Sequence, residues 1–311
     1  MHITKPAFSS LCVMGILAWH TASADAPAGR RTLIHDGLTR SYVVRLPVQA
    51  TGASAKLPLV LVLHGGGGDA DNAERMTGFT AKARKEGFIV VYPEGTSRFG
   101  DKLLSWNAGH CCAHAMKNVV DDVGFVRELI DMLAGDYPVD MRRVYVTGMS
   151  NGGMMAHRLG IELPDRIAGI APVVGTLFGD EKPPASPVPA LMINGMRDEH
   201  VPWRGGPPGG RGARSWDGTP TQPAVYQFEF WSRANGCNQP ATQHDNGRWL
   251  QWRDTCPSRD DVVLYVIKDN GHAWPGGEKG SRRGDAPSSA LNATDIIWEF
   301  FAGHEGAHVS R

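Results

Sequence analysis

Residues 144–152 read VYVTGMSNG, and they carry the strongest structural signal in the chain. The first four are β-branched or aromatic and predict a buried strand. Gly148, Ser150 and Gly152 then form a G-x-S-x-G motif, and helical spacing follows from residue 154. A serine between a strand and a helix sits on a sharp turn that flanking glycines permit, so its hydroxyl projects from the top of a sheet. The context predicts Ser150 as a nucleophile.

Strands and helices are predicted to alternate on both sides of this stretch. Apolar or β-branched runs predict strands at residues 43–46, 59–63, 89–92, 144–147, 170–174, 191–194 and 262–267. Helical spacing predicts helices at residues 73–85, 122–133, 154–162, 224–235 and 293–301. This alternation indicates an α/β fold with a mostly parallel central sheet and helices on both faces, here an α/β-hydrolase fold. The Gly-, Pro- and Arg-rich residues 203–223 and 276–289 are predicted to be surface loops near the active face.

A serine nucleophile needs a base and a group that orients the base. In this fold the chain order is serine, acid, histidine. Asp198 follows the predicted strand at residues 191–194, and His272 follows the one at residues 262–267. Both positions lie beyond the carboxyl ends of strands, where ligands bind in open parallel sheets. We therefore predict His272 as the general base and Asp198 as its acid, with the neighbouring Glu199 as the competing acid.

A glycine-rich loop, residues 64–68 (HGGGG), follows the predicted strand at residues 59–63. The α/β-hydrolase fold places an oxyanion loop of the HGGG type there. We predict that one oxyanion donor is the backbone N–H of Asn151 and the other is that of Gly66 or Gly67. A phosphate-binding loop is disfavoured, because no Lys-Ser or Lys-Thr pair follows the glycines.

The N-terminus predicts export. Lys5 precedes an apolar run at residues 11–19 and the small residues Ala22-Ser23-Ala24, which is the order found in a secretory signal peptide. We expect cleavage after Ala24, a secreted protein, either extracellular or periplasmic, and a single catalytic domain over residues 25–311. The 32 basic and 32 acidic residues give a formal net charge of zero, which argues against nucleic acid or an anionic membrane as a partner. Oligomeric state is left open.

Four cysteines remain after cleavage: Cys111, Cys112, Cys237 and Cys256. An even number in an exported chain favours disulfides, and three pairings are possible. A bond between Cys111 and Cys112 would join neighbours, and one between Cys237 and Cys256 is the easier to form. His110 and His114 flank the first pair and suggest a metal cluster, but adjacent thiols lack zinc-site spacing. We expect no metal and no cofactor.

Several blocks, taken together, resemble a known family. They are HGGG at residues 64–67, WNAG at 106–109 with the following cysteines, VDDVGF at 120–125, GMSNGGMM at 148–155 and GHAWPG at 271–276. In this order they are similar to the polyhydroxybutyrate depolymerase and feruloyl esterase family, from about residue 40 to residue 301. The resemblance implies an exported, metal-free esterase with the three catalytic residues named above.

The resemblance leaves the substrate open, because similar members include feruloyl esterases, acetylxylan esterases, hydroxyalkanoate-polymer depolymerases and some poly(aspartic acid) hydrolases. A peptidase and a non-catalytic binding protein are the less favoured alternatives. Because the chain ends at Arg311 with no room for a polymer-binding domain, we expect soluble aryl or acyl-sugar esters. Trp106, Trp274 and His64 are candidate substrate-binding residues, the tryptophans by stacking, with core packing as the alternative. Asp121 and Asp122 are expected to cap a helix or to hold the loop that carries Trp106.

Overall fold

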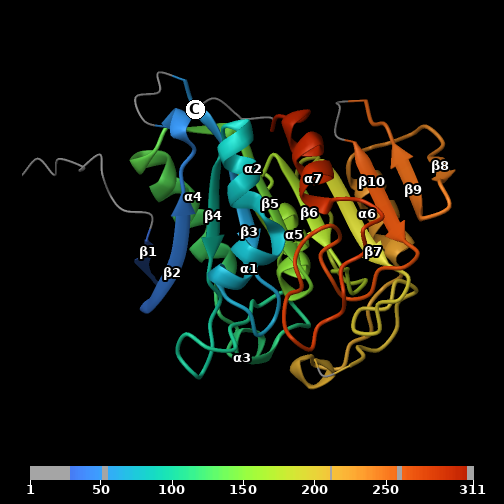
Figure 1. Cartoon of the computed structure of the whole chain (residues 1–311), viewed down its shortest axis with the longest axis horizontal. Coiled ribbons are helices and arrows are strands. Elements are labelled where there is room, and N and C mark those ends of the chain that lie inside the picture. Colours follow the sequence, from blue (N-terminus) through green and yellow to red (C-terminus); the bar gives the residue numbers. More distant parts are fainter. Residues whose placement is uncertain (1–28, 51–54, 211, 258–260, 307–311) are drawn as a thin grey trace, which may run out of the picture.

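A computed structural model describes residues 29–50, 55–210, 212–257 and 261–306 (Figure 1). The predicted signal peptide lies outside the described residues. The described chain forms a ten-stranded sheet in the order β1-β2-β4-β3-β5-β6-β7-β10-β9-β8. The strands are β1 Arg30–His35, β2 Leu38–Arg45, β3 Leu57–Leu63, β4 Ile89–Pro93, β5 Val139–Met149, β6 Gly169–Val173, β7 Ala190–Gly195, β8 Thr242–Asp245, β9 Trp249–Asp254 and β10 Val262–Ile267. The helices are α1 Ala70–Thr77, α2 Phe79–Glu86, α3 Ala113–Lys117, α4 Asp122–Asp136, α5 Asn151–Glu162, α6 Ala224–Ala234 and α7 Ala293–Ala302, with short 3-10 turns at Val48–Ala50 and Ala213–Ser215.

The centre of the sheet is parallel, as predicted. β4, β3, β5, β6, β7 and β10 pair in parallel, while β1 and β2 at one edge and β9 and β8 at the other pair antiparallel. The central strands are buried along nearly their whole length, which explains why they read as continuous apolar runs in the sequence. The carboxyl ends of parallel strands share one edge, so the loops that follow them meet there.

Helices cover both faces of the sheet (Figure 1). Alternate residues of β3 show the division, because Leu59 and Leu61 belong to one buried cluster and Val60 and Val62 to the other. The first cluster also contains apolar residues of α4, α5 and α6, and the second contains those of α1, α2 and α7. The two cores fix the sheet in position between the two layers of helices.

The structure corrects one predicted helix and adds elements that the sequence did not indicate. The helix predicted at residues 73–85 is two helices, which meet at Gly78 with a φ of 69°. This left-handed residue ends α1, and its N–H donates to the carbonyl of Glu74. The strand β8 is exposed at all four residues, so it has no apolar pattern. β1, β9 and the five-residue α3 were missed as well.

Candidate active site

Ser150 lies at the junction of β5 and α5 in a strained backbone conformation, with φ 57° and ψ −122°. The glycines on either side make this turn possible. A Cβ on Gly148 would lie 2.7 Å from the carbonyl carbon of Gly152, and one on Gly152 would lie 2.5 Å from the carbonyl oxygens of Leu63 and His64. Only glycine fits at either position, and the turn presents Ser150 at the edge where the parallel strands end.

The structure brings the three predicted residues together in one hydrogen-bonded chain. His272 Nε2 lies 2.8 Å from Ser150 Oγ, and His272 Nδ1 lies 2.7 Å from Asp198 Oδ2. The carboxylate fixes the tautomer, because Oδ2 accepts only from a protonated Nδ1, which leaves Nε2 to accept from the serine hydroxyl. The competing acid, Glu199, is exposed on the same turn.

Asp198 is itself held by the turn that carries it. It is 5% exposed, and its second oxygen accepts the backbone N–H groups of His200 and Val201, each at 2.8 Å. Both carboxylate oxygens are thus engaged, one by the turn and one by His272. A buried carboxylate with this many partners has a fixed orientation.

The structure supports some of the predicted oxyanion donors and excludes another. Asn151 is the first residue of α5, where backbone N–H groups have no partner within the helix. Gly66 lies beside it, since a Cβ on Gly66 would be 3.7 Å from the Cβ of Asn151. The N–H of Gly67, by contrast, donates to the carbonyl of Leu104 at 2.7 Å. The prediction of Gly67 as an oxyanion donor is therefore wrong, and Gly66 is the candidate that remains.

His64 is buried and cannot contact a substrate, contrary to the prediction. Its Nδ1 donates to the carbonyl of Gly65 at 2.8 Å, and its Nε2 accepts the N–H of Gly95 at 3.0 Å. Burial lowers the pKa of His64 below its ordinary value and favours the neutral ring that these two bonds require. His64 holds the glycine loop in place.

The two predicted stacking tryptophans are also fully buried, so this prediction is wrong as well. Trp106 donates from its indole N–H to the carbonyl of His64 at 3.0 Å. Trp274 donates to Thr294 Oγ1 at 3.0 Å and packs edge-on against Phe79. A buried tryptophan with its N–H satisfied belongs to the core. Core packing, the alternative weighed for these residues, is the role that the structure shows.

The predicted roles of Asp121 and Asp122 are confirmed. Asp121 accepts the N–H of Gly124 at 2.8 Å and caps α4. Asp122 accepts the N–H of Asn107, the residue after Trp106, at 2.7 Å. Its other oxygen pairs at 2.6 Å with Arg40, which the sequence did not indicate as part of the site.

The cysteines form two disulfides, Cys111–Cys112 and Cys237–Cys256. The second is the pairing that the sequence favoured, and the first includes a cis peptide bond. Their sulfurs are therefore not thiolate ligands for a metal held with the flanking histidines. His110 instead lies between two carboxylates, with Nδ1 2.7 Å from Asp217 and Nε2 2.9 Å from Asp180.

In the described part of the chain, one group of three metal-ligating side chains lies close together: Asp198, His200 and His272. The rings of His200 and His272 are stacked, with centroids 4.8 Å apart and planes inclined by 24°. Imidazole lone pairs lie in the ring plane, so those of two stacked rings run side by side and do not converge on one ion. The geometry suits ring packing better than chelation.

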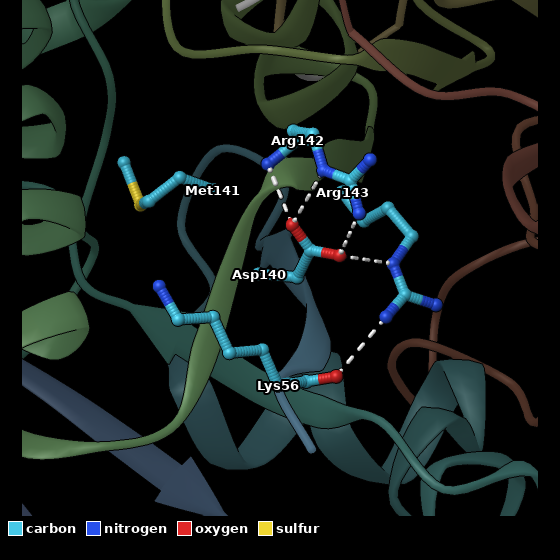
Figure 2. Close-up of a pocket in the computed structure, with 5 residues that line it drawn as sticks. All are labelled: Lys56, Asp140, Met141, Arg142 and Arg143. Atoms are coloured by element: carbon cyan, nitrogen blue, oxygen red, sulfur yellow. Dashed lines mark hydrogen bonds and ion pairs between the residues drawn. The ribbon is translucent and has the colours of Figure 1, made fainter. Parts of the chain in front are cut away.

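A hollow lies at the opposite end of β5 from Ser150. It is lined by Lys56, Asp140, Met141, Arg142 and Arg143 (Figure 2). Both arginines turn toward the carboxylate of Asp140, with Nη2 of Arg142 at 3.3 Å and Nε of Arg143 at 2.8 Å. Their charges are thus already paired, and the hollow is far from the site built around Ser150.

None of the helices described is both long and apolar enough to span a membrane.

The geometry agrees with the comparison to known proteins. The family described as esterase PHB depolymerase matches residues 40–222. The chain belongs to this family. Its members are carboxylic ester hydrolases, and this chain is therefore one of that enzyme class.

The family contains relatives of different length and name. The protein NocK of Nocardia uniformis subsp. tsuyamanensis is 32% identical over 295 residues, which cover 90% of this chain and 84% of NocK. Feruloyl esterase B of Piromyces equi is 31% identical over 248 residues, covering 78% of this chain but only 44% of that protein. The solved structure of an acetyl xylan esterase from Aspergillus awamori superposes with a TM-score of 0.60 at 13% identity, over 88% of this chain and 99% of that one. At that identity the likeness establishes the α/β-hydrolase fold alone.

Proposed function

We propose that this protein is an exported serine esterase that cleaves carboxylic esters through an acyl-enzyme. The observation that carries the proposal is the unbroken chain of hydrogen bonds from Asp198 through His272 to Ser150. In it Ser150 is the nucleophile, His272 the general base and Asp198 the group that orients the base.

The reaction follows from the positions of these groups. Ser150 Oγ attacks the ester carbonyl while its proton passes to His272 Nε2. The N–H groups of Asn151 and Gly66 stabilise the negative oxygen of the tetrahedral intermediate. His272 then gives its proton to the departing alcohol, and the acyl group remains on Ser150. A water molecule, deprotonated by the same histidine, releases the acid and restores the serine.

For the substrate we propose soluble aryl or acyl-sugar esters, of the feruloyl or acetyl-sugar type. The similarity to a feruloyl esterase supports this class. A hydroxyalkanoate polymer or oligomer is the second candidate, because the family as a whole is described by its depolymerase members. Initial rates on methyl ferulate, acetylated xylan, hydroxybutyrate oligomers and a matched amide would rank these substrates. Higher kcat/KM on the oligomers than on methyl ferulate would favour the second candidate.

Export is supported by the predicted signal peptide and by the two disulfides, which persist in oxidising compartments. Expression of the full chain in a bacterial host, followed by N-terminal sequencing of the exported protein, tests it. A mature N-terminus at Asp25 is the expected result. Retention of the whole chain in the cytoplasm would contradict this part of the proposal.

The nucleophile is tested by Ser150→Ala. We expect a folded protein whose kcat falls by about 10⁶-fold, because removal of the serine in such a site leaves only binding and oxyanion stabilisation. Ser281→Ala in an exposed loop is the matched control and should keep full activity. An alkyl fluorophosphonate should label the wild-type protein once, at Ser150. Wild-type turnover in Ser150→Ala would end the serine-esterase proposal.

A further inference from the structure

Asp285 contacts the backbone of His272, and no role follows for it from the reaction as described. Its Oδ2 accepts the N–H of His272 at 2.7 Å. The adjacent Gly271 leaves room for this contact, because a Cβ there would collide with the same carboxylate. Asp285 belongs to the Gly-, Pro- and Arg-rich loop at residues 276–289, which otherwise has no assigned function.

The same loop is joined to the histidine turn at a second point. Asn270 is fully buried, and its Nδ2 donates to the carbonyls of Gly271 and Ala273 at 2.8 and 3.0 Å. Its Oδ1 accepts the N–H of Ser288 at 3.0 Å. The turn that carries His272 is therefore fastened to residues 285–288 through both its backbone and a buried amide.

The imidazole of His272 is thus restrained from three directions. Asp198 bonds the edge of the ring, His200 stacks on its face, and Asp285 bonds the backbone at its base. The first two contacts act on the ring itself. The third determines where the side chain begins, and a shift of its Cα would move Nε2 away from Ser150.

We propose that Asp285 is a positioning residue for the general base, and that the loop at residues 276–289 serves to carry it. The inference rests on the proposed serine-esterase mechanism. The carboxylate acts through the backbone amide as a hydrogen-bond acceptor. Its negative charge is not what the role requires. An asparagine at this position supplies an acceptor of the same shape, whereas an alanine supplies none.

The test compares Asp285→Ala with Asp285→Asn, with Glu278→Ala as the control. Glu278 lies in the same loop, but its exposed side chain pairs with Arg75 across the surface. We expect Asp285→Ala to lower kcat by about 10²-fold with KM within about twofold, since a displacement of roughly 1 Å costs that much. Asp285→Asn should recover kcat to within about threefold of wild type, and Glu278→Ala should match wild type.

A second readout separates misplacement of His272 from loss of folding. The rate at which an alkyl fluorophosphonate labels Ser150 depends on activation by His272, so it should fall in Asp285→Ala in step with kcat, while the far-UV spectrum stays native. Full activity in Asp285→Ala, or equal loss in the alanine and asparagine variants, would overturn the inference. If either of these results were found and Ser150→Ala were inactive, the inference about Asp285 would fail and the proposed function would stand. An active Ser150→Ala would contradict both the proposed function and the inference.

Discussion

The two sides of Ser150 are held in place by different means. On the glycine-loop side, formed by residues 64–68 with Trp106 and Asn151, the supporting side chains are buried. His64 and Trp106 are 0% exposed and Asn151 is 1% exposed. On the histidine side, formed by residues 195–201 and 269–288, Asp198 and Asn270 are buried, but His272 itself and its contacts His200 and Asp285 are partly exposed.

This difference predicts that substitutions on the two sides affect different quantities, stability on the glycine-loop side and kcat on the histidine side. The buried groups on the glycine-loop side bond to one another and to the backbone, for example the side chain of Asn151 to both the N–H and the carbonyl of Trp106. Their loss leaves buried polar groups unpaired, which lowers the free energy of unfolding. The histidine side carries the group that must accept a proton in the reaction. Changes there should act on kcat more than on folding.

The largest difference between the effect on kcat and the effect on stability is expected at Asp198. Asp198→Asn keeps the shape of the side chain but favours the wrong tautomer of His272, so kcat should fall by about 10⁴-fold. The melting temperature should change little by comparison. Glu199→Gln on the same turn is the control, and steady-state kinetics on a p-nitrophenyl ester measures both. If kcat fell strongly in Glu199→Gln and not in Asp198→Asn, the residue that orients His272 would be Glu199.

The opposite pattern is expected at the buried pair Arg40 and Asp122, which adjoins the glycine-loop side because Asp122 accepts the N–H of the residue after Trp106. Both side chains are at most 1% exposed, and burial raises the pKa of Asp122 and lowers that of Arg40, because leaving water disfavours each charge. Removing one partner leaves the other charge buried and unpaired, so Asp122→Leu or Arg40→Met alone should cost about 3–5 kcal/mol in the free energy of unfolding. The double variant, Arg40→Met with Asp122→Leu, should lose much less than the sum.

Urea unfolding of the four proteins completes this cycle, and kcat of the folded fraction is the second measurement. Near-additive losses would mean that the two charges do not depend on each other. A large fall in kcat with unchanged stability would erase the distinction between the two sides of Ser150.

The parallel core and the three aligned residues could be predicted from the sequence, because both have local signals. Buried strands read as continuous apolar runs, and Ser150, Asp198 and His272 each follow such a run. The exposed strand β8 has no such signal, and the break at Gly78 is a single residue within a helical pattern.

Two supporting residues, Arg40 and Asp285, could not be predicted, because no local sequence pattern marks their partners. Arg40 meets Asp122 across 82 positions, and Asp285 is one of many polar residues in a loop without periodicity. The prediction that the tryptophans stack on the substrate was wrong for a different reason. An indole beside a motif can face a substrate or the core, and only its surroundings decide. Trp106 and Trp274 both lie within such motifs and had the same expectation, and both are fully buried core residues.

The smallest expected effect concerns His110, which lies outside both sides and pairs with Asp180 and Asp217. Burial alone would lower the pKa of His110, but its hydrogen bonds to these carboxylates outweigh burial and raise the pKa above the ordinary value of 6.5. A raised pKa in the folded state means that the charged ring stabilises the fold below about pH 6.5, and that this stabilisation is lost as the pH rises through the folded-state pKa. His110→Gln should therefore reduce the free energy of unfolding at about pH 5.5 by up to about 1 kcal/mol, and by less at about pH 9. Urea titrations at the two pH values measure this difference, with His244→Gln on the exposed strand β8 as the control. An equal loss at both pH values would show that the ring acts as a neutral hydrogen-bonding group whose contribution to stability does not depend on its charge.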